Sequence, residues 1–124
     1  MNKTLHLLYS HNIYVMTWEA ALKILELSRE WQHKDTKKHE PLLLASGAVC
    51  SILHEAWQHN ADAPVFIKNL NDAQFEVHKV RQNLTVVKDM GLLDVKTAKH
   101  LEKMYAEIHE KMDEVIKHIE KKTS

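Results

Sequence analysis

Residues 66–93 read FIKNLNDAQFEVHKVRQNLTVVKDMGLL, and this stretch decides the fold. Side chains spaced three and four residues apart lie on one face of an α-helix. Gly91 follows, where a helix end favours a residue that tolerates a positive φ. The stretch therefore predicts a helix over residues 64–90 with one narrow apolar face, made of Phe66, Leu70, Ala73, Val77, Val80, Leu84 and Val87.

The rest of the chain predicts three more helices. Apolar residues keep helical spacing in three further segments, so we expect helices over residues 12–33, 41–59 and 94–121. The polar segment 33–40 is the expected first loop, and Asp62 and Asp94 are the expected N-caps of the last two helices. Residues 1–11 leave two alternatives open: they extend the first helix, or they fold back over the bundle.

The composition limits the fold class. The 124 residues include only two Gly and two Pro, too few turn-forming residues for an all-β fold. Four helices joined by short loops predict a single domain over residues 1–124, an all-α antiparallel bundle with up-down-up-down topology. Gly47 lies inside the predicted second helix, where it predicts a close approach of another helix.

Charge and cysteine content narrow the class of protein. Seventeen basic and seventeen acidic residues cancel, unlike the composition of a strongly basic nucleic-acid-binding protein. The single Cys50 excludes an internal disulfide and fits a reducing compartment. No apolar run approaches the roughly 20 residues of a membrane span. We therefore expect a soluble cytoplasmic protein that does not contact a membrane.

The predicted first and second helices carry more apolar surface than one packing seam uses. Large apolar surface left in water favours burial against another subunit. The alternative is that residues 1–11 cover it. The candidate interface residues are Tyr14, Trp18, Leu25, Leu53 and Trp57.

The sequence offers few motifs that are typical of catalytic or metal-binding sites. The chain has ten histidines, but it contains one Glu-x-x-His, EWQH at residues 30–33, whereas a di-iron bundle needs this motif on two helices. Cys50 lies on an apolar face and is expected to be a small buried hydrophobic residue. There is no Gly-rich phosphate loop and no nucleophile elbow. We expect no enzyme, no cofactor, no metal and no small-molecule substrate, while a His-rich metal- or pH-responsive bundle stays open as an alternative.

Basic residues gather on the polar side of the predicted third helix. Arg81, one of two arginines, suits a bidentate contact with phosphate or carboxylate. The alternative is a solvated face balanced by Glu76 and Asp89. The candidate nucleic-acid or partner-binding residues are His78, Lys79, Arg81 and Lys88.

The third predicted helix and the turn after it carry a recognisable order of residues: Phe66, Leu70, Ala73, Val80, Leu84, Gly91 and Leu93, with a weaker match, AVCSI, at residues 48–52. In this order the chain resembles small four-helix-bundle proteins encoded in 23S rRNA intervening sequences, and the related accessory variability (Avd) proteins of diversity-generating retroelements. The Asn-Ile-Ala-Glu-Gly that ends helix two in the intervening-sequence proteins is replaced by HEAWQH at residues 54–59. The acidic residues that the intervening-sequence proteins carry in the middle of helix three are replaced here by Lys79 and Arg81. A basic residue at that point is more similar to the Avd branch.

The resemblance implies a homopentameric ring of bundles and no enzymatic activity. For Avd-type members it also implies binding to a reverse transcriptase and its template RNA. The expected function is therefore that of a non-catalytic oligomeric accessory or adaptor protein. A pure protein-binding scaffold without nucleic-acid contact is the alternative.

Overall fold

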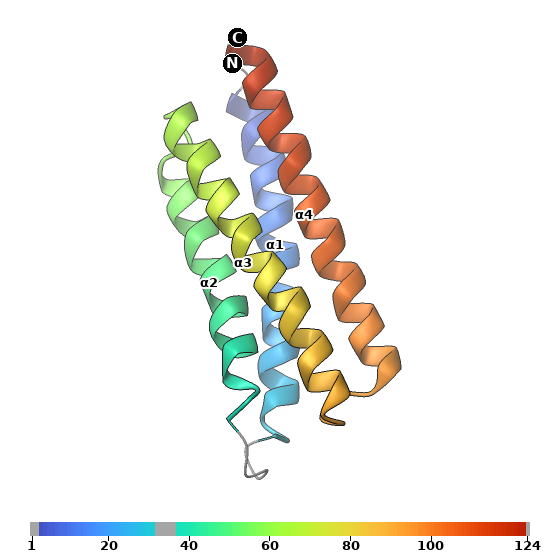
Figure 1. Cartoon of the computed structure of the whole chain (residues 1–124). Helices are drawn as coiled ribbons and strands as arrows, with labels where there is room; N and C mark the ends of the chain where they lie inside the picture. Colours follow the sequence, from blue (N-terminus) through green and yellow to red (C-terminus); the bar gives the residue numbers. More distant parts are fainter. Residues whose placement is uncertain (1–2, 32–36, 124) are drawn as a thin grey trace.

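The computed structural model describes the backbone of residues 3–31 and 37–123, and the side chains of residues 12–31 and 37–121. It is an all-α antiparallel four-helix bundle, as the sequence predicts (Figure 1). Its helices are α1 (Lys3–Ser28), α2 (Glu40–Gln58), α3 (Ala63–Asp89) and α4 (Val95–Thr123).

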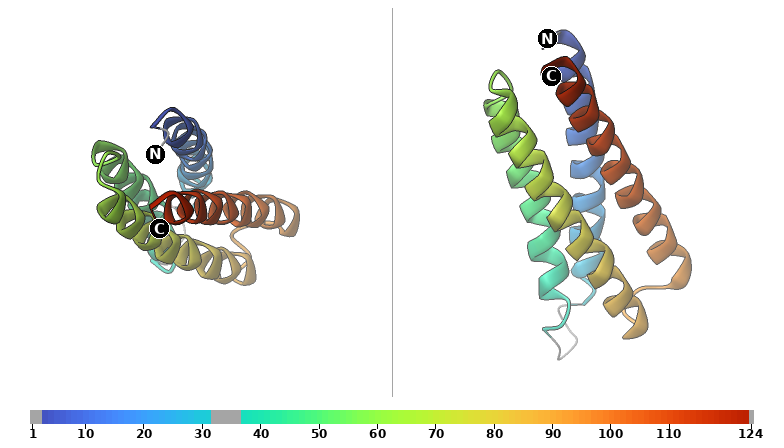
Figure 2. Two further views of the ribbon diagram at one scale, coloured as in Figure 1. Left: turned by 90° about the horizontal axis from the view of Figure 1, so that it is seen from above. Right: turned by 45° about the horizontal axis from the view of Figure 1, so that its top comes forward.

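Each helix packs against two neighbours: α1 and α3 both contact α2 and α4. The longest shared contact joins α2 and α3, which lie side by side in both views of Figure 2. The start of α1 and the end of α4 lie at the same end of the bundle, beside the connection from α2 to α3 (Figure 1). No helix in the described ranges has the length and apolar character to cross a membrane.

The helix ends follow local rules that the sequence already displays. Asp62 Oδ1 accepts a hydrogen bond from the Val65 N–H at 3.2 Å, and Asp94 Oδ1 accepts one from Thr97 at 2.7 Å. Both aspartates therefore cap their helices as predicted. Gly91 has φ +78°, and the N–H of Leu92 bonds to the carbonyl of Val87 behind it. This is the left-handed turn that ends α3.

The predicted bounds of the first helix, residues 12–33, are wrong at both ends. The helix begins at Lys3, so residues 3–11 extend it and do not fold back. It ends at Ser28, because the N–H of Trp31 bonds to the Ser28 carbonyl at 2.9 Å in a tighter turn. The Trp31 side chain is thereby free to reach another part of the bundle. Residues 32 and 33 lie outside the described residues.

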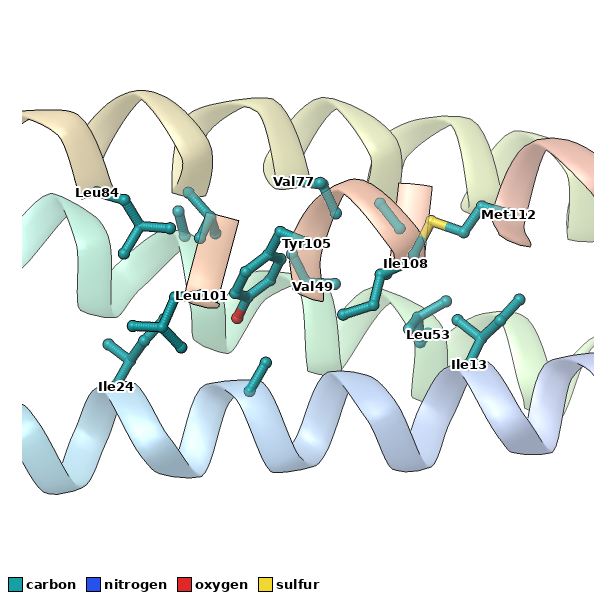
Figure 3. Close-up of a cluster of buried hydrophobic side chains, with 14 of the residues drawn as sticks. Ile13, Ile24, Val49, Leu53, Val77, Leu84, Leu101, Tyr105, Ile108 and Met112 are labelled. Carbon is teal, nitrogen blue, oxygen red and sulfur yellow. The ribbon is translucent and has the colours of Figure 1, made fainter. Parts of the chain in front are cut away.

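The buried apolar side chains of all four helices form one core, part of which is drawn in Figure 3. The predicted face of α3 is fully buried, and α4 contributes a matching row that includes Leu101, Tyr105, Ile108 and Met112. Tyr105 reaches across the core from α4, with its hydroxyl group on the side of α1 (Figure 3). The expectation for Gly47 is wrong: among the described residues, a Cβ atom built there meets nothing within 4 Å, so no close helix contact requires the glycine.

Candidate functional site

A groove between α1 and α2, here called the α1–α2 groove, is a mainly apolar hollow on the described surface. Its volume is about 570 Å³. Three large side chains on its α1 wall are exposed to water: Trp18 by 43%, Leu22 by 52% and Leu25 by 47%. The remaining lining includes Tyr14, Ala21, Leu43, Ser46, Gly47, Cys50, Ser51 and His54. Because Gly47 has no side chain, this wall of α2 stays open.

Three of the five predicted interface residues meet in this groove: Tyr14, Trp18 and Leu25. Leu53 does not belong with them, because it is only 6% exposed and packs in the core of its own bundle. Trp57 is half-buried and does not line the groove. Leu22 and Leu43 also line the groove but were not among the predicted residues, although both lie within the wide apolar faces of their helices. Only the rotation of each helix about its axis decides which part of such a face stays exposed.

The cysteine that lines the α1–α2 groove is held in an unreactive state. The Cys50 thiol points to the carbonyl of Thr17, with sulfur and oxygen 3.9 Å apart, and burial raises its pKa to about 11. The thiol is therefore protonated at neutral pH and is a poor nucleophile. The Tyr14 ring packs edge-on against Trp18, with ring centres 6.2 Å apart. These properties suit packing against another apolar surface.

A second hollow, here called the α3–α4 groove, has a volume of about 470 Å³. His78, Arg81 and Lys88 line it from α3, and Lys99 and Glu102 line it from α4. Its apolar floor includes Leu84 and Ala98. Arg81 Nε donates to Glu102 Oε1 at 2.6 Å, which ties the guanidinium group to α4. Three permanent cations thus face one carboxylate.

Lys79, the fourth residue predicted for this surface, does not line this groove with the other three. Its Nζ atom lies 3.2 Å from Glu76 Oε1 and 4.8 Å from the centre of the Phe75 ring. It lines a shallow hollow beside Leu44, on the α2 side of α3. One residue along a helix turns the side chain by about 100°, which separates Lys79 from His78. Lys99 was missed because it comes from a different helix.

The histidines whose side chains the structure describes do not gather into a cluster of metal ligands. His59 Nε2 is 3.2 Å from Glu55 Oε1, and His109 Nδ1 is 3.8 Å from Asp113 Oδ2. The rings of His78 and His109 pack edge-on with centres 5.1 Å apart. Among residues 12–31 and 37–121, no three His, Cys, Asp or Glu side chains come together as metal ligands.

Comparison with known proteins adds a structural neighbour. No protein-family model and no curated protein matches the sequence. The fold matches the crystal structure of a protein of unknown function from the S23 ribosomal protein family of Bacteroides thetaiotaomicron, with a TM-score of 0.80. The match covers 88% of this chain and 98% of that chain at 19% identity. Such identity establishes a shared fold alone, and this fold fits the resemblance to the 23S rRNA intervening-sequence proteins without singling out the Avd branch.

Proposed function

We propose that the chain is a non-catalytic accessory protein that self-associates through the α1–α2 groove. The observation that carries this proposal is the exposure of Trp18, Leu22 and Leu25 along one wall of an apolar hollow of about 570 Å³. Contiguous apolar surface of this kind is typical of protein interfaces and unfavourable on a monomer. The backbone supports the proposal, because residues 3–11 continue α1 and do not fold back as a cover.

A second apolar surface suggests how the copies meet. Leu44 is 74% exposed and Phe75 is 62% exposed, and both lie on the α2–α3 side of the bundle. The α1–α2 groove of one copy would receive these protruding side chains from the next copy. Because the two surfaces differ, the contact is heterologous, and repeated heterologous contacts close into a ring when the rotation permits. This arrangement agrees with the homopentamer that the family resemblance implies.

Paired charge substitutions test this arrangement. Leu22→Asp places a charge in the α1–α2 groove, and Leu44→Asp places one on the protruding surface formed by Leu44 and Phe75. Each variant alone is therefore expected to be a monomer. A mixture of the two retains one intact groove and one intact protruding surface, and is expected to form a one-to-one dimer. Size exclusion with light scattering reads all three masses. Val95→Asp is the control, because Val95 is 59% exposed but lies on α4, away from both surfaces.

If both variants keep the wild-type mass, the proposed contact is rejected. If both are monomers but their mixture stays monomeric, the contact pairs like surfaces and the heterologous arrangement is rejected. If Val95→Asp also dissociates the assembly, the effect of added charge is not specific to the groove.

The second candidate is binding to a reverse transcriptase and its RNA, as the resemblance to the Avd branch implies. The α3–α4 groove favours it, because Arg81, Lys88 and Lys99 line one hollow. We expect Arg81→Ala combined with Lys88→Ala to abolish binding of labelled single-stranded RNA, measured by fluorescence anisotropy at low salt. Lys79→Ala, on the other face of α3, is the matched control and is expected to bind normally. If the wild type binds no RNA, this candidate fails and the pure protein-binding scaffold is left.

A further inference from the structure

We infer that the α3–α4 groove is a binding site for a phosphate monoester. This inference does not need self-association. It concerns the groove of the nucleic-acid candidate but goes beyond that candidate, because the groove is assigned a phosphate monoester whereas the RNA backbone carries phosphodiesters.

Arg81 is the group that would hold the phosphate. Its Nε atom donates to Glu102 Oε1 at 2.6 Å, and no other side-chain bond of Arg81 occurs among the described residues. The Glu102 contact thus uses one edge of the guanidinium plane and restrains its orientation. The two Nη groups form the remaining edge, whose parallel N–H groups match two oxygens of a phosphate. An arginine held in place loses less side-chain freedom when it binds an anion.

Two lysines add charge on opposite walls. Lys88 comes from α3, and its Nζ atom is 4.0 Å from Asp89 Oδ1 at the limit of an ion pair. Lys99 comes from α4 and has no ion-pair partner within the described part of the chain. With Arg81, they place three cations against the single Glu102 carboxylate. Asp89, which lies outside the groove lining, offsets part of the Lys88 charge, and the remaining excess of positive charge suits the dianion of a phosphate monoester better than the single charge of a carboxylate or a phosphodiester.

The floor of the groove favours a particular kind of group attached to the phosphate. Leu84, Val95 and Ala98 line it between the charged walls, and Gln82 and Thr85 add polar groups. A volume of about 470 Å³ lies within the range of small-molecule sites. A ligand with an apolar or aromatic body next to its phosphate therefore fits better than inorganic phosphate alone.

The test uses phenyl phosphate as the probe, with binding followed through the Arg81 Nε–H signal and backbone amides in ¹H–¹⁵N NMR spectra. We expect saturable shifts at Arg81, Lys88 and Lys99. Diphenyl phosphate, which carries one charge, and inorganic phosphate, which has no apolar body, are each expected to bind about tenfold more weakly. Arg81→Lys keeps the charge but removes the paired N–H groups, so it is expected to weaken phenyl phosphate binding about tenfold. Lys79→Ala, on the other face of α3, is expected to leave binding unchanged.

No saturable shift with phenyl phosphate overturns the inference, as does Arg81→Lys binding as well as the wild type, because general positive charge would then explain the result. Equal binding of the monoester and the diester overturns the assignment of the dianion. The outcomes separate this inference from the nucleic-acid candidate. Phenyl phosphate binding without RNA binding supports the inference and rejects the candidate, whereas RNA binding without phenyl phosphate binding does the reverse.

Discussion

The indole N–H of Trp31 donates to the carbonyl oxygen of Leu92 at 2.8 Å, and joins the end of α1 to the α3–α4 connection 61 residues later. Trp31 is only 2% exposed, and its ring packs edge-on against His39 with ring centres 5.8 Å apart. This contact holds together the end of the bundle where α1 and α3 end and α2 and α4 begin (Figure 1).

Replacing Trp31 by Phe keeps an aromatic ring but removes the N–H donor. The Leu92 carbonyl then loses its side-chain partner, and the smaller ring leaves a gap. We expect the free energy of unfolding to fall by about 2 kcal/mol, measured by urea denaturation. A fall of less than about 0.5 kcal/mol would show that the hydrogen bond contributes little.

Replacing each of the two glycines by alanine is expected to change the free energy of unfolding in opposite directions. Gly47→Ala places a methyl group in open space on α2, so we expect the free energy of unfolding to rise by about 1 kcal/mol from helix propensity alone. Gly91→Ala forces an alanine to φ +78°, and we expect a loss of about 1–2 kcal/mol. Both are measured in the same urea series. Equal effects of the two substitutions would contradict this difference in backbone conformation.

The Tyr105 hydroxyl is fully buried and has no hydrogen-bond partner among the described residues. Burial raises its pKa, and the nearby Cys50 thiol adds to that shift. Tyr105→Phe removes a buried polar group without emptying the core, so we expect the free energy of unfolding to rise by about 1 kcal/mol. Tyr14→Phe is the control, because Tyr14 is only half-buried. A loss of stability in Tyr105→Phe would mean that the hydroxyl group has a partner in solution.

The Cys50 thiol predicts a loss of stability at alkaline pH. Its pKa is about 11 in the folded protein against 9.0 for the free group, because burial disfavours the thiolate. Between pH 9 and 11 the unfolded chain releases the proton while the folded chain keeps it, so the free energy of unfolding falls as the pH rises. We expect the free energy of unfolding of Cys50→Ala, measured by urea denaturation, to fall less steeply across this interval than that of the wild type. Parallel curves for the two proteins would contradict the raised pKa.

The sequence predicted most of the fold because the relevant signals are local. The narrow apolar face of α3, its Asp62 cap and the turn at Gly91 each depend on residues a few positions apart. The end of α1 was predicted wrongly, because the Trp31 side chain bonds to the Leu92 carbonyl, 61 residues later in the sequence. Helical spacing alone gives no sign of such a contact.

The candidate sites were predicted less completely for the same reason. Tyr14, Trp18 and Leu25 were found because α1 has a wide apolar face, but the burial of Leu53 depends on how α2 is rotated toward α3. Lys79 and His78 are adjacent in sequence yet lie on different faces of α3. Lys99 and Glu102 complete the α3–α4 groove from another helix, and this pairing exists only in the folded bundle.

The central claim, self-association through the α1–α2 groove, is tested most directly by the solution mass of the wild-type protein. Size exclusion coupled to light scattering, at several protein concentrations, separates the outcomes. We predict a discrete multiple of the 14.5 kDa chain, with a mass near five subunits if the family resemblance extends to assembly. A mass of one chain at every concentration would contradict the claim and leave Trp18, Leu22 and Leu25 exposed to water.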